Sequence, residues 1–164
     1  MSMQLSKKEQ MLLKDMLHHE ELCIGKYGNY AQQARDPQLQ QLFATYQTKE
    51  QQHHDTINQL LQGQIPSLAS NQSGQSGQGQ GQGQQTVQWS NFAGASGMVD
   101  QNDATLCTDA LTTEKFVSGA YDTVIFEAVN QPVRQALQHI QKEEQEHGAG
   151  IFDYMQQHGM YQVE

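Results

Sequence analysis

Residues 142–147 read KEEQEH, and residues 49–54 read KEQQHH. Both segments contain the pattern Glu-x-x-His, with Glu50 and His53 in the first and Glu144 and His147 in the second. On a helix, residues three apart lie on the same face, so one turn presents a carboxylate and an imidazole together. Whether these groups face solvent or a core decides both the fold and the chemistry of the chain.

The two segments belong to a repeat that covers most of the chain. A shift of 94 residues aligns Glu50 with Glu144 and His53 with His147. The same shift aligns further identical pairs: Leu12 with Leu106, Asp15 with Asp109, Leu17 with Leu111, Glu20 with Glu114, Gly25 with Gly119, Tyr27 with Tyr121, Ala34 with Ala128 and Ile57 with Ile151. The repeat predicts two equivalent structural units in one chain.

Each unit has the pattern of a helical hairpin. Apolar residues recur at helical spacing over about residues 5–34 and again from Asp36 to Gly63. Asp36 before Pro37, and Asn130 shortly before Pro132, are signals of helix starts. Helices resume near residue 104, and the last one runs to residue 159. The sequence predicts no strand, a first hairpin over 5–62 and a second over 104–160.

A Gln/Gly-rich crossover joins the hairpins over residues 63–103, and its composition cannot build a core. So long a connection is expected if the second and third helices run parallel, because a helix of about 27 residues is roughly 40 Å long. Trp89 and Phe92 are the side chains able to attach the far end of the crossover to the bundle. We expect residues 1–164 to form one domain.

The repeated acids occupy core positions of the predicted helices. The inward row of the second helix is Phe43, Tyr46, Glu50, His53 and Ile57, and that of the fourth is Leu137, Ile140, Glu144, His147 and Ile151. Glu20 and Glu114 replace core residues in the first and third helices. Glu20 lies 16 residues before Asp36 and Glu50 lies 14 after it, which is about 24 Å and about 21 Å along the helices. Four carboxylates and two imidazoles should therefore meet at one level.

Four ionised carboxylates in a dry core would cost many kcal/mol, and two divalent cations would remove that cost. One Glu from each of two helices, with Glu-x-x-His from each of the others, is the arrangement of di-iron and di-manganese carboxylate bundles. We predict an all-α, ferritin-like four-helix bundle that holds two divalent metal ions. Iron or manganese suits these ligands best, and zinc also fits. The predicted metal ligands are Glu20, Glu50, His53, Glu114, Glu144 and His147.

Several alternatives stay open. The symmetric pattern could be an inherited repeat that has lost its metal. Glu21 could point inward in place of Glu20, but the repeat aligns it with Lys115 and favours Glu20. Asp15 and Asp109 are either acceptors for the outer N–H of a ligand histidine or charges near helix N-termini.

Other polar residues are interpreted as ordinary. Glu143 and Glu146 are expected in solvent, and Tyr27 and Tyr121 are interpreted as core packing rather than redox partners. Histidines without a histidine partner in the repeat are expected at the surface: His18, His19, His54, His139 and His158.

Composition narrows the class of protein. The 164 residues carry a formal charge of −9 and no basic cluster, which argues against nucleic acid or an anionic membrane as a partner. No apolar run is long enough to span a membrane. The start, MSMQLSKKEQ, lacks the apolar segment of a signal peptide. Cys23 and Cys107 are expected to be buried free thiols. We expect synthesis in the cytoplasm.

The second half resembles the coat F domain of spore coat proteins from endospore-forming bacteria, over about residues 104–164. The resemblance rests on Asp109, Leu111, Glu114, Lys115, Tyr121, Arg134, Leu137, Glu143, Glu144, Ile151, Phe152, Met155, Gly159 and Tyr161. It implies a helical protein of the spore coat, made in the mother-cell cytoplasm, with other coat proteins as partners and a possible homo-oligomer. It implies no known reaction, since the family is regarded chiefly as structural. A purely structural role would not account for the six candidate ligands.

Overall fold

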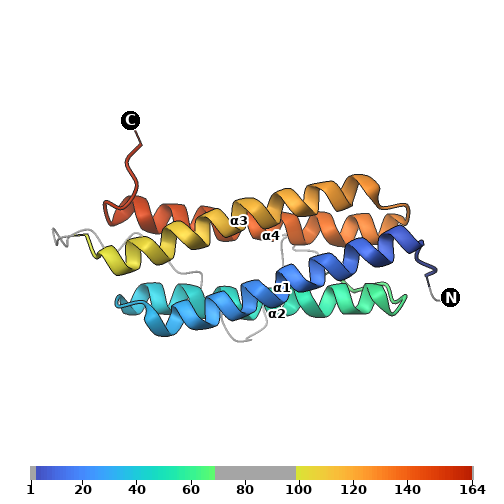
Figure 1. The fold of residues 1–164 in the computed structure, drawn as a ribbon, viewed down its shortest axis with the longest axis horizontal. Coiled ribbons are helices and arrows are strands. Elements are labelled where there is room, and N and C mark those ends of the chain that lie inside the picture. The colour runs from blue at the N-terminus through green and yellow to red at the C-terminus, as the bar shows by residue number, and fades with distance from the viewer. Residues whose placement is uncertain (1–2, 69–98, 164) are drawn as a thin grey trace, which may run out of the picture. The chain divides into compact units, whose positions relative to one another are not determined.

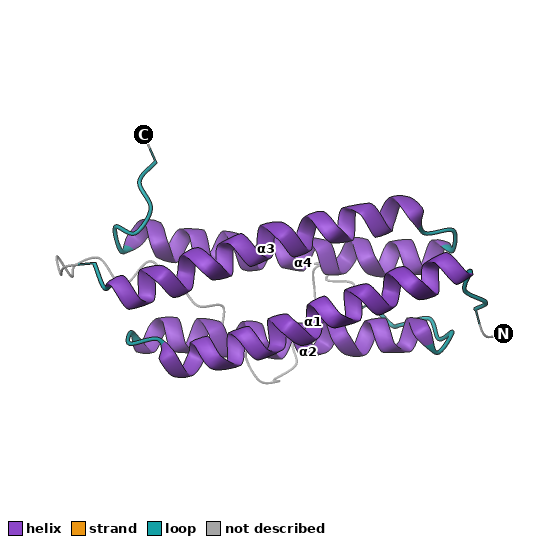
Figure 2. Cartoon of the chain, in the orientation of Figure 1, coloured by secondary structure: helices purple, strands orange, loops and turns teal. Residues whose placement is uncertain are grey.

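The computed structural model describes residues 3–68 and 99–163. This part of the chain contains four α-helices and no strand (Figure 2): α1 (Lys7–Gln33), α2 (Pro37–Leu61), α3 (Gln101–Glu127) and α4 (Gln131–Gln157). The predicted all-α four-helix fold is confirmed. Helix α3 begins three residues earlier than expected, because the Asp100 carboxylate accepts the Asp103 N–H and caps it. The proposed attachment through Trp89 and Phe92 lies outside the described residues.

Local signals set the helix ends much as the sequence indicates. The Asp36 side chain accepts the N–H of Gln38, and Pro37 fills the first helical position of α2. Gly63 and Gly159 follow the ends of α2 and α4 with φ angles of 74° and 68°. Because a side chain disfavours this left-handed conformation, glycine is the residue suited to stop a helix there.

The helices pair as two hairpins, with α1 along α2 and α3 along α4, and α1 also contacts α3 while α2 contacts α4 (Figure 1). Helix α2 ends beside the start of α1, where the Met3 N–H donates to the Gly63 carbonyl at 2.9 Å. Helix α3 begins beside the α1–α2 turn, where Asp103 accepts the Asp36 N–H. Helices α2 and α3 therefore run parallel, as the long crossover predicts.

Two buried carboxylates join the hairpins end to end. Glu9 of α1 accepts the N–H groups of Val129 and Asn130, at 3.0 and 2.7 Å, in the α3–α4 turn. Asp103 of α3 accepts the N–H groups of Arg35 and Asp36, at 2.8 and 2.9 Å, in the α1–α2 turn. Glu9 and Asp103 are equivalent under the 94-residue shift. This reciprocal pairing fixes the level of one hairpin against the other.

The core has two chemically different ends. Near the α1–α2 turn, Tyr27 packs against Phe43 and Tyr46, with ring centroids 5.8 and 5.6 Å apart. The opposite end is mainly aliphatic and is built from Leu13, Met16, Ile57, Leu60, Val117, Val124, Ile125, Val133, Leu137 and Ile140. Cys23 and Cys107 are buried free thiols, as expected. The polar residues predicted from the repeat lie between these two ends.

Candidate metal centre

The predicted ligands lie at the middle of the helices. Glu20, Glu114 and Glu144 are the central residues of their 27-residue helices, and Glu50 lies one residue past the centre of the 25-residue α2. These residues and the two histidines are only 0–4% exposed. The structure thus brings all six residues into the core, and Glu21, the alternative to Glu20, is exposed.

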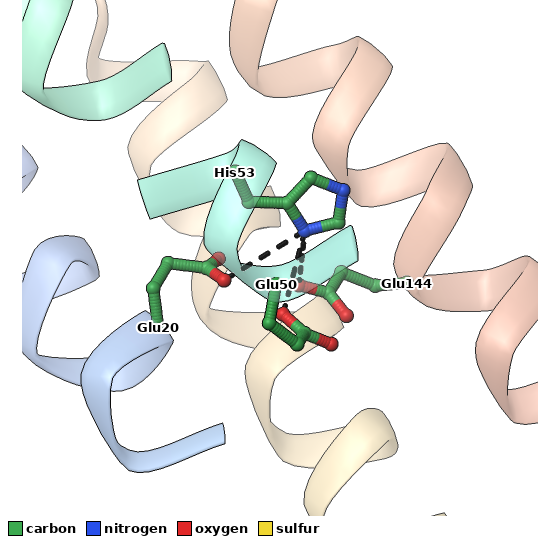
Figure 3. A group of neighbouring side chains, drawn as sticks. All are labelled: Glu20, Glu50, His53 and Glu144. Carbon is green, nitrogen blue, oxygen red and sulfur yellow. Dashed lines mark ion pairs between the residues drawn. The ribbon is translucent and has the colours of Figure 1, made fainter. Parts of the chain in front are cut away.

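The six side chains form two overlapping groups. One contains Glu20, Glu50, His53 and Glu144 (Figure 3), and the other contains Glu50, Glu114, Glu144 and His147. In each group, one nitrogen or oxygen atom per residue lies within 4.8 Å of the others. Glu50 and Glu144 belong to both groups, so the two groups share two carboxylates.

Both histidines direct Nδ1 into the carboxylates. His53 Nδ1 lies 3.3 Å from Glu144 Oε1 and 3.4 Å from Glu50 Oε2. His147 Nδ1 lies 3.0 Å from Glu50 Oε1 and 3.4 Å from Glu144 Oε2. Because each imidazole also contacts the Glu one turn before it, the Glu-x-x-His spacing delivers an oxygen and a nitrogen to one point, as expected.

Tyrosines hold the two unshared carboxylates. The Tyr27 hydroxyl donates to Glu114 Oε1, and the Tyr121 hydroxyl donates to Glu20 Oε1. Tyr27 and Tyr121 are equivalent in the repeat, and each donates to the Glu of the other hairpin. Packing alone is therefore an incomplete account of these tyrosines, since each holds one oxygen of a candidate ligand.

Glu143 contacts His53, a candidate ligand, at the ring nitrogen that lies away from the cluster. Its Oε2 lies 2.7 Å from His53 Nε2, and its Oε1 lies 3.7 Å from Lys49 Nζ. The hydrogen bond with His53 is the main cause that lowers the pKa of Glu143 to about 2. The expectation that Glu143 is simply solvated is wrong. No repeat signal marks it, because the equivalent residue is Lys49.

The other polar residues considered in the sequence have different outcomes in the structure. Asp109 accepts hydrogen bonds from Lys26 and Tyr30 instead of a ligand histidine, and Asp15 is exposed. Glu146 is exposed, as predicted. None of the five histidines predicted at the surface is buried.

The carboxylates of the cluster differ in the direction in which their pKa values are shifted. Desolvation raises the pKa of Glu20 well above its ordinary value and that of Glu114 to about 8. Burial also raises the pKa of Glu144, but the nearby His147 and His53 imidazoles outweigh it, so the pKa falls below its usual range. Among the described residues, no lysine or arginine pairs with these six side chains, so only the two imidazoles supply positive charge.

The cluster leaves hydrogen-bonding capacity unused. Within the described residues, seven buried side-chain nitrogen or oxygen atoms have no hydrogen-bond partner, and six of them belong to this cluster. They are Glu20 Oε2, Glu50 Oε2, His53 Nδ1, Glu114 Oε2, and both Oε atoms of Glu144. Buried polar atoms without partners are costly and call for an explanation. All six belong to side chains of the two groups that could hold a metal ion, and their oxygens and nitrogen are ligand types that a cation accepts.

These features define a four-helix bundle with a buried carboxylate–histidine cluster at its centre. The Coat F domain model matches residues 8–64 and 102–164, and the chain belongs to that family. The match extends the resemblance to the first hairpin, and its two parts begin 94 residues apart, in register with the repeat. Membership of the family implies an association with the spore coat.

The chain is also 35% identical over 65 residues to an uncharacterized protein, YusN, from Bacillus subtilis (strain 168). The match covers 40% of this chain and 59% of that protein. No solved structure matches the chain significantly. Among the described helices, none is both long and apolar enough to cross a membrane.

Proposed function

We propose that this protein is a ferritin-like, spore-coat-associated bundle with a dinuclear metal site. The observation that carries the proposal is a set of six buried nitrogen and oxygen atoms without hydrogen-bond partners, all on side chains of the two overlapping ligand groups. Two divalent ions would offset the charge of four carboxylates, and the two overlapping ligand groups provide one position for each ion. Glu50 and Glu144, which belong to both ligand groups, would help to hold both ions.

The ligand atoms narrow the choice of metal ion. Four carboxylates and two imidazoles suit iron or manganese, and zinc also accepts such ligands. When bound, iron would supply redox chemistry toward oxygen or peroxide, with metal oxidation, peroxide removal or electron transfer as outcomes. The chain itself contributes the fixed Nδ1 atoms of His53 and His147 and the tyrosine donors that hold Glu20 and Glu114. The remaining apolar core excludes bulk water from these groups.

One observation favours a second candidate, a structural coat protein with a metal-free site. The pKa values of Glu20 and Glu114 are raised by burial, and those of His53 and His147 are raised by hydrogen bonds to carboxylates that outweigh the lowering effect of burial. Two protonated acids, two imidazolium rings and two carboxylates would leave the cluster without net charge. Such a protein should fold without metal and tolerate low pH.

Elemental analysis of protein purified without added metal or chelator separates the two candidates. The metal proposal expects about two iron or manganese ions per chain. Chelator should then lower the melting temperature, since a ligand at 100 times its Kd contributes about 2.7 kcal/mol. Glu50→Ala should abolish both the metal content and the chelator effect, whereas Glu146→Ala should change neither. Metal-free protein that also takes up no ferrous iron under anaerobic conditions would favour the structural candidate.

A storage function of the ferritin type is a further alternative. It needs a closed shell of subunits, so a monomer or dimer in solution would exclude it. Sedimentation of the full chain measures this directly.

A further inference from the structure

A chain of aromatic rings leads from the cluster to the surface of α1. The Tyr46 ring is stacked on His147, a candidate ligand, with ring centroids 4.3 Å apart. Tyr27 lies 5.6 Å from Tyr46 and 6.4 Å from His147. Phe43 lies 5.8 Å from Tyr27 and 5.7 Å from Tyr30, which is partly exposed. Each separation is within about 7 Å, the range of aromatic rings in contact, so the rings form a continuous path.

The two tyrosines at the inner and outer ends of this path both donate to a carboxylate. The Tyr27 hydroxyl donates to Glu114 Oε1, and the Tyr30 hydroxyl donates to Asp109 Oδ2. Asp109 also accepts from Lys26 Nζ at 2.8 Å, and hydrogen bonds from Lys26 and Tyr30 lower its pKa. A phenol that loses an electron becomes a strong acid, so its oxidation requires a group that accepts the proton. Each tyrosine has such a group in contact.

The second hairpin lacks the aromatic path. Tyr121 is the repeat equivalent of Tyr27 and donates to Glu20. The 94-residue shift replaces the other three rings by buried aliphatic side chains: Tyr46 by Ile140, Phe43 by Leu137 and Tyr30 by Val124. Because aliphatic residues fill these positions in one half of the bundle, packing alone does not require aromatic rings in the other half.

We propose that the aromatic path of Tyr46, Tyr27, Phe43 and Tyr30 transfers single electrons between the metal centre and a reactant at the surface. This inference rests on the proposed metal site. The six candidate ligands are only 0–4% exposed, so a reactant of more than a few atoms cannot touch them. Electron transfer through protein slows steeply with distance, so several short steps are faster than one long step. The partner is therefore a one-electron oxidant or reductant that meets the chain at Tyr30.

Electrons and protons balance along this path. An oxidant at the surface takes one electron from Tyr30, whose proton moves to Asp109. Tyr30 is restored by an electron from Tyr27 and by the return of its proton. Tyr27, whose proton moves to Glu114 Oε1, is restored by an electron from the metal centre and by the return of that proton. The net change is one electron from the metal to the oxidant, with no proton released.

Oxidation of the ferrous-loaded chain by hexachloroiridate(IV), under anaerobic conditions, tests the path. This anion accepts one electron and is too large to enter the core. Iron content is measured first, and the loss of the visible absorption of hexachloroiridate then gives the rate, with metal-free chain as the background. Tyr30→Phe should keep the iron content and slow the reaction several-fold, because a phenylalanine ring is much harder to oxidise than a phenol.

Tyr161→Phe is the matched control. It makes the same change at an exposed tyrosine that packs against Phe152, outside the aromatic path, and the rate should equal that of wild type. Phe43→Leu introduces the residue of the second hairpin and should slow the reaction in the same direction as Tyr30→Phe. If Phe43→Leu fails to fold, Tyr30→Phe still decides, because Tyr30 is partly exposed.

Heavy water provides a readout that a purely structural role of Tyr30 would not change. Wild type should react more slowly in heavy water, because the Tyr30 proton moves to Asp109, and Tyr30→Phe should lose most of this difference. A loaded Tyr30→Phe chain as fast as wild type, or Tyr161→Phe slowed as much, would overturn the inference and leave the metal site standing. A wild-type chain that takes up no ferrous iron would instead remove the proposed function, and the electron path with it.

Discussion

Glu143 Oε2 lies 2.7 Å from His53 Nε2, on the side of the imidazole opposite the Nδ1 that enters the carboxylate cluster. The contact orients the ring, since a histidine that donates one N–H to a carboxylate presents its other nitrogen as a ligand. Because Lys49 is the repeat equivalent of Glu143, the two candidate metal positions are chemically different.

We expect Glu143→Gln to weaken one of the two metal positions. Loss of the carboxylate partner of a ligand histidine typically costs 10–100-fold in affinity, so cobalt titration should give one weakened site and one near the wild-type affinity. Glu146→Gln is the control, since Glu146 is exposed and pairs with Lys142 at 3.9 Å, away from the cluster. Equal weakening of both sites would show that Glu143 does not act through His53.

Removal of either tyrosine hydroxyl should destabilise the bundle. Tyr27→Phe leaves Glu114 Oε1 without its donor, and Tyr121→Phe does the same to Glu20 Oε1. Each change should lower the free energy of unfolding by about 1–3 kcal/mol, the cost of a buried polar atom left unpaired. Urea denaturation with and without chelator measures this. Tyr46→Phe is the control, because Tyr46 contacts His147 through its ring. Two tyrosine variants as stable as wild type would argue for packing alone.

Glu9 should make the bundle sensitive to acid. Burial raises its pKa, but hydrogen bonds from Asn130 and Ser6 outweigh this and hold the pKa below its ordinary value of 4.5. Glu9 therefore contributes stability that is present above about pH 4.5 and is lost as the pH falls through its folded pKa. Glu9→Gln should cost about 1–3 kcal/mol at neutral pH and less in acid.

Urea denaturation of Glu9→Gln between neutral pH and pH 3 tests the sign. Glu127→Gln is the control, since Glu127 forms an exposed pair with Lys8, and it should change stability by less than about 1 kcal/mol. A difference between wild type and Glu9→Gln that grows as the pH falls would contradict the assignment.

Gly150 and Gly119 should respond in opposite ways to alanine. A Cβ at Gly150 would overlap the Tyr46 hydroxyl and lie 3.3 Å from its Cζ, whereas a Cβ at Gly119 meets nothing within 4 Å. Gly150→Ala should destabilise by about 1–3 kcal/mol, because the Tyr46 ring is stacked on His147 at 4.3 Å. Gly119→Ala should stabilise by about 0.5–1 kcal/mol, because alanine favours helix.

Thermal unfolding of both alanine variants checks the signs, and a double variant identifies the cause. Tyr46→Phe removes the overlapping oxygen, so Gly150→Ala should cost less in that background. If Gly150→Ala is as harmful in the Tyr46→Phe background as in the wild-type chain, the overlap with the Tyr46 hydroxyl is not the reason.

The positions of the candidate ligands are easier to predict from the sequence than the residues that surround them. The position of a residue along its helix depends on the rise per residue and the number of residues from the turn, and both can be read from the sequence. This is why the sequence predicts that the four glutamates meet at one level: Glu20, Glu50, Glu114 and Glu144. The crossed pairing of Tyr27 with Glu114 could not be counted in this way, because it joins different hairpins. The repeat also gave no sign of Glu143, because a residue that differs between the two halves produces no repeated pattern.

The sequence by itself determined the four helices, their main start signals and the inward position of the six candidate ligands. These properties depend on helical period, local capping and a repeat, all of which are local or internal to the chain. Only the tertiary structure decided that Glu143 supports His53, that Glu9 and Asp103 bridge the hairpins, and that Tyr30 meets Asp109. These contacts depend on how one hairpin is rotated against the other, which does not follow from the periodicity of a single helix.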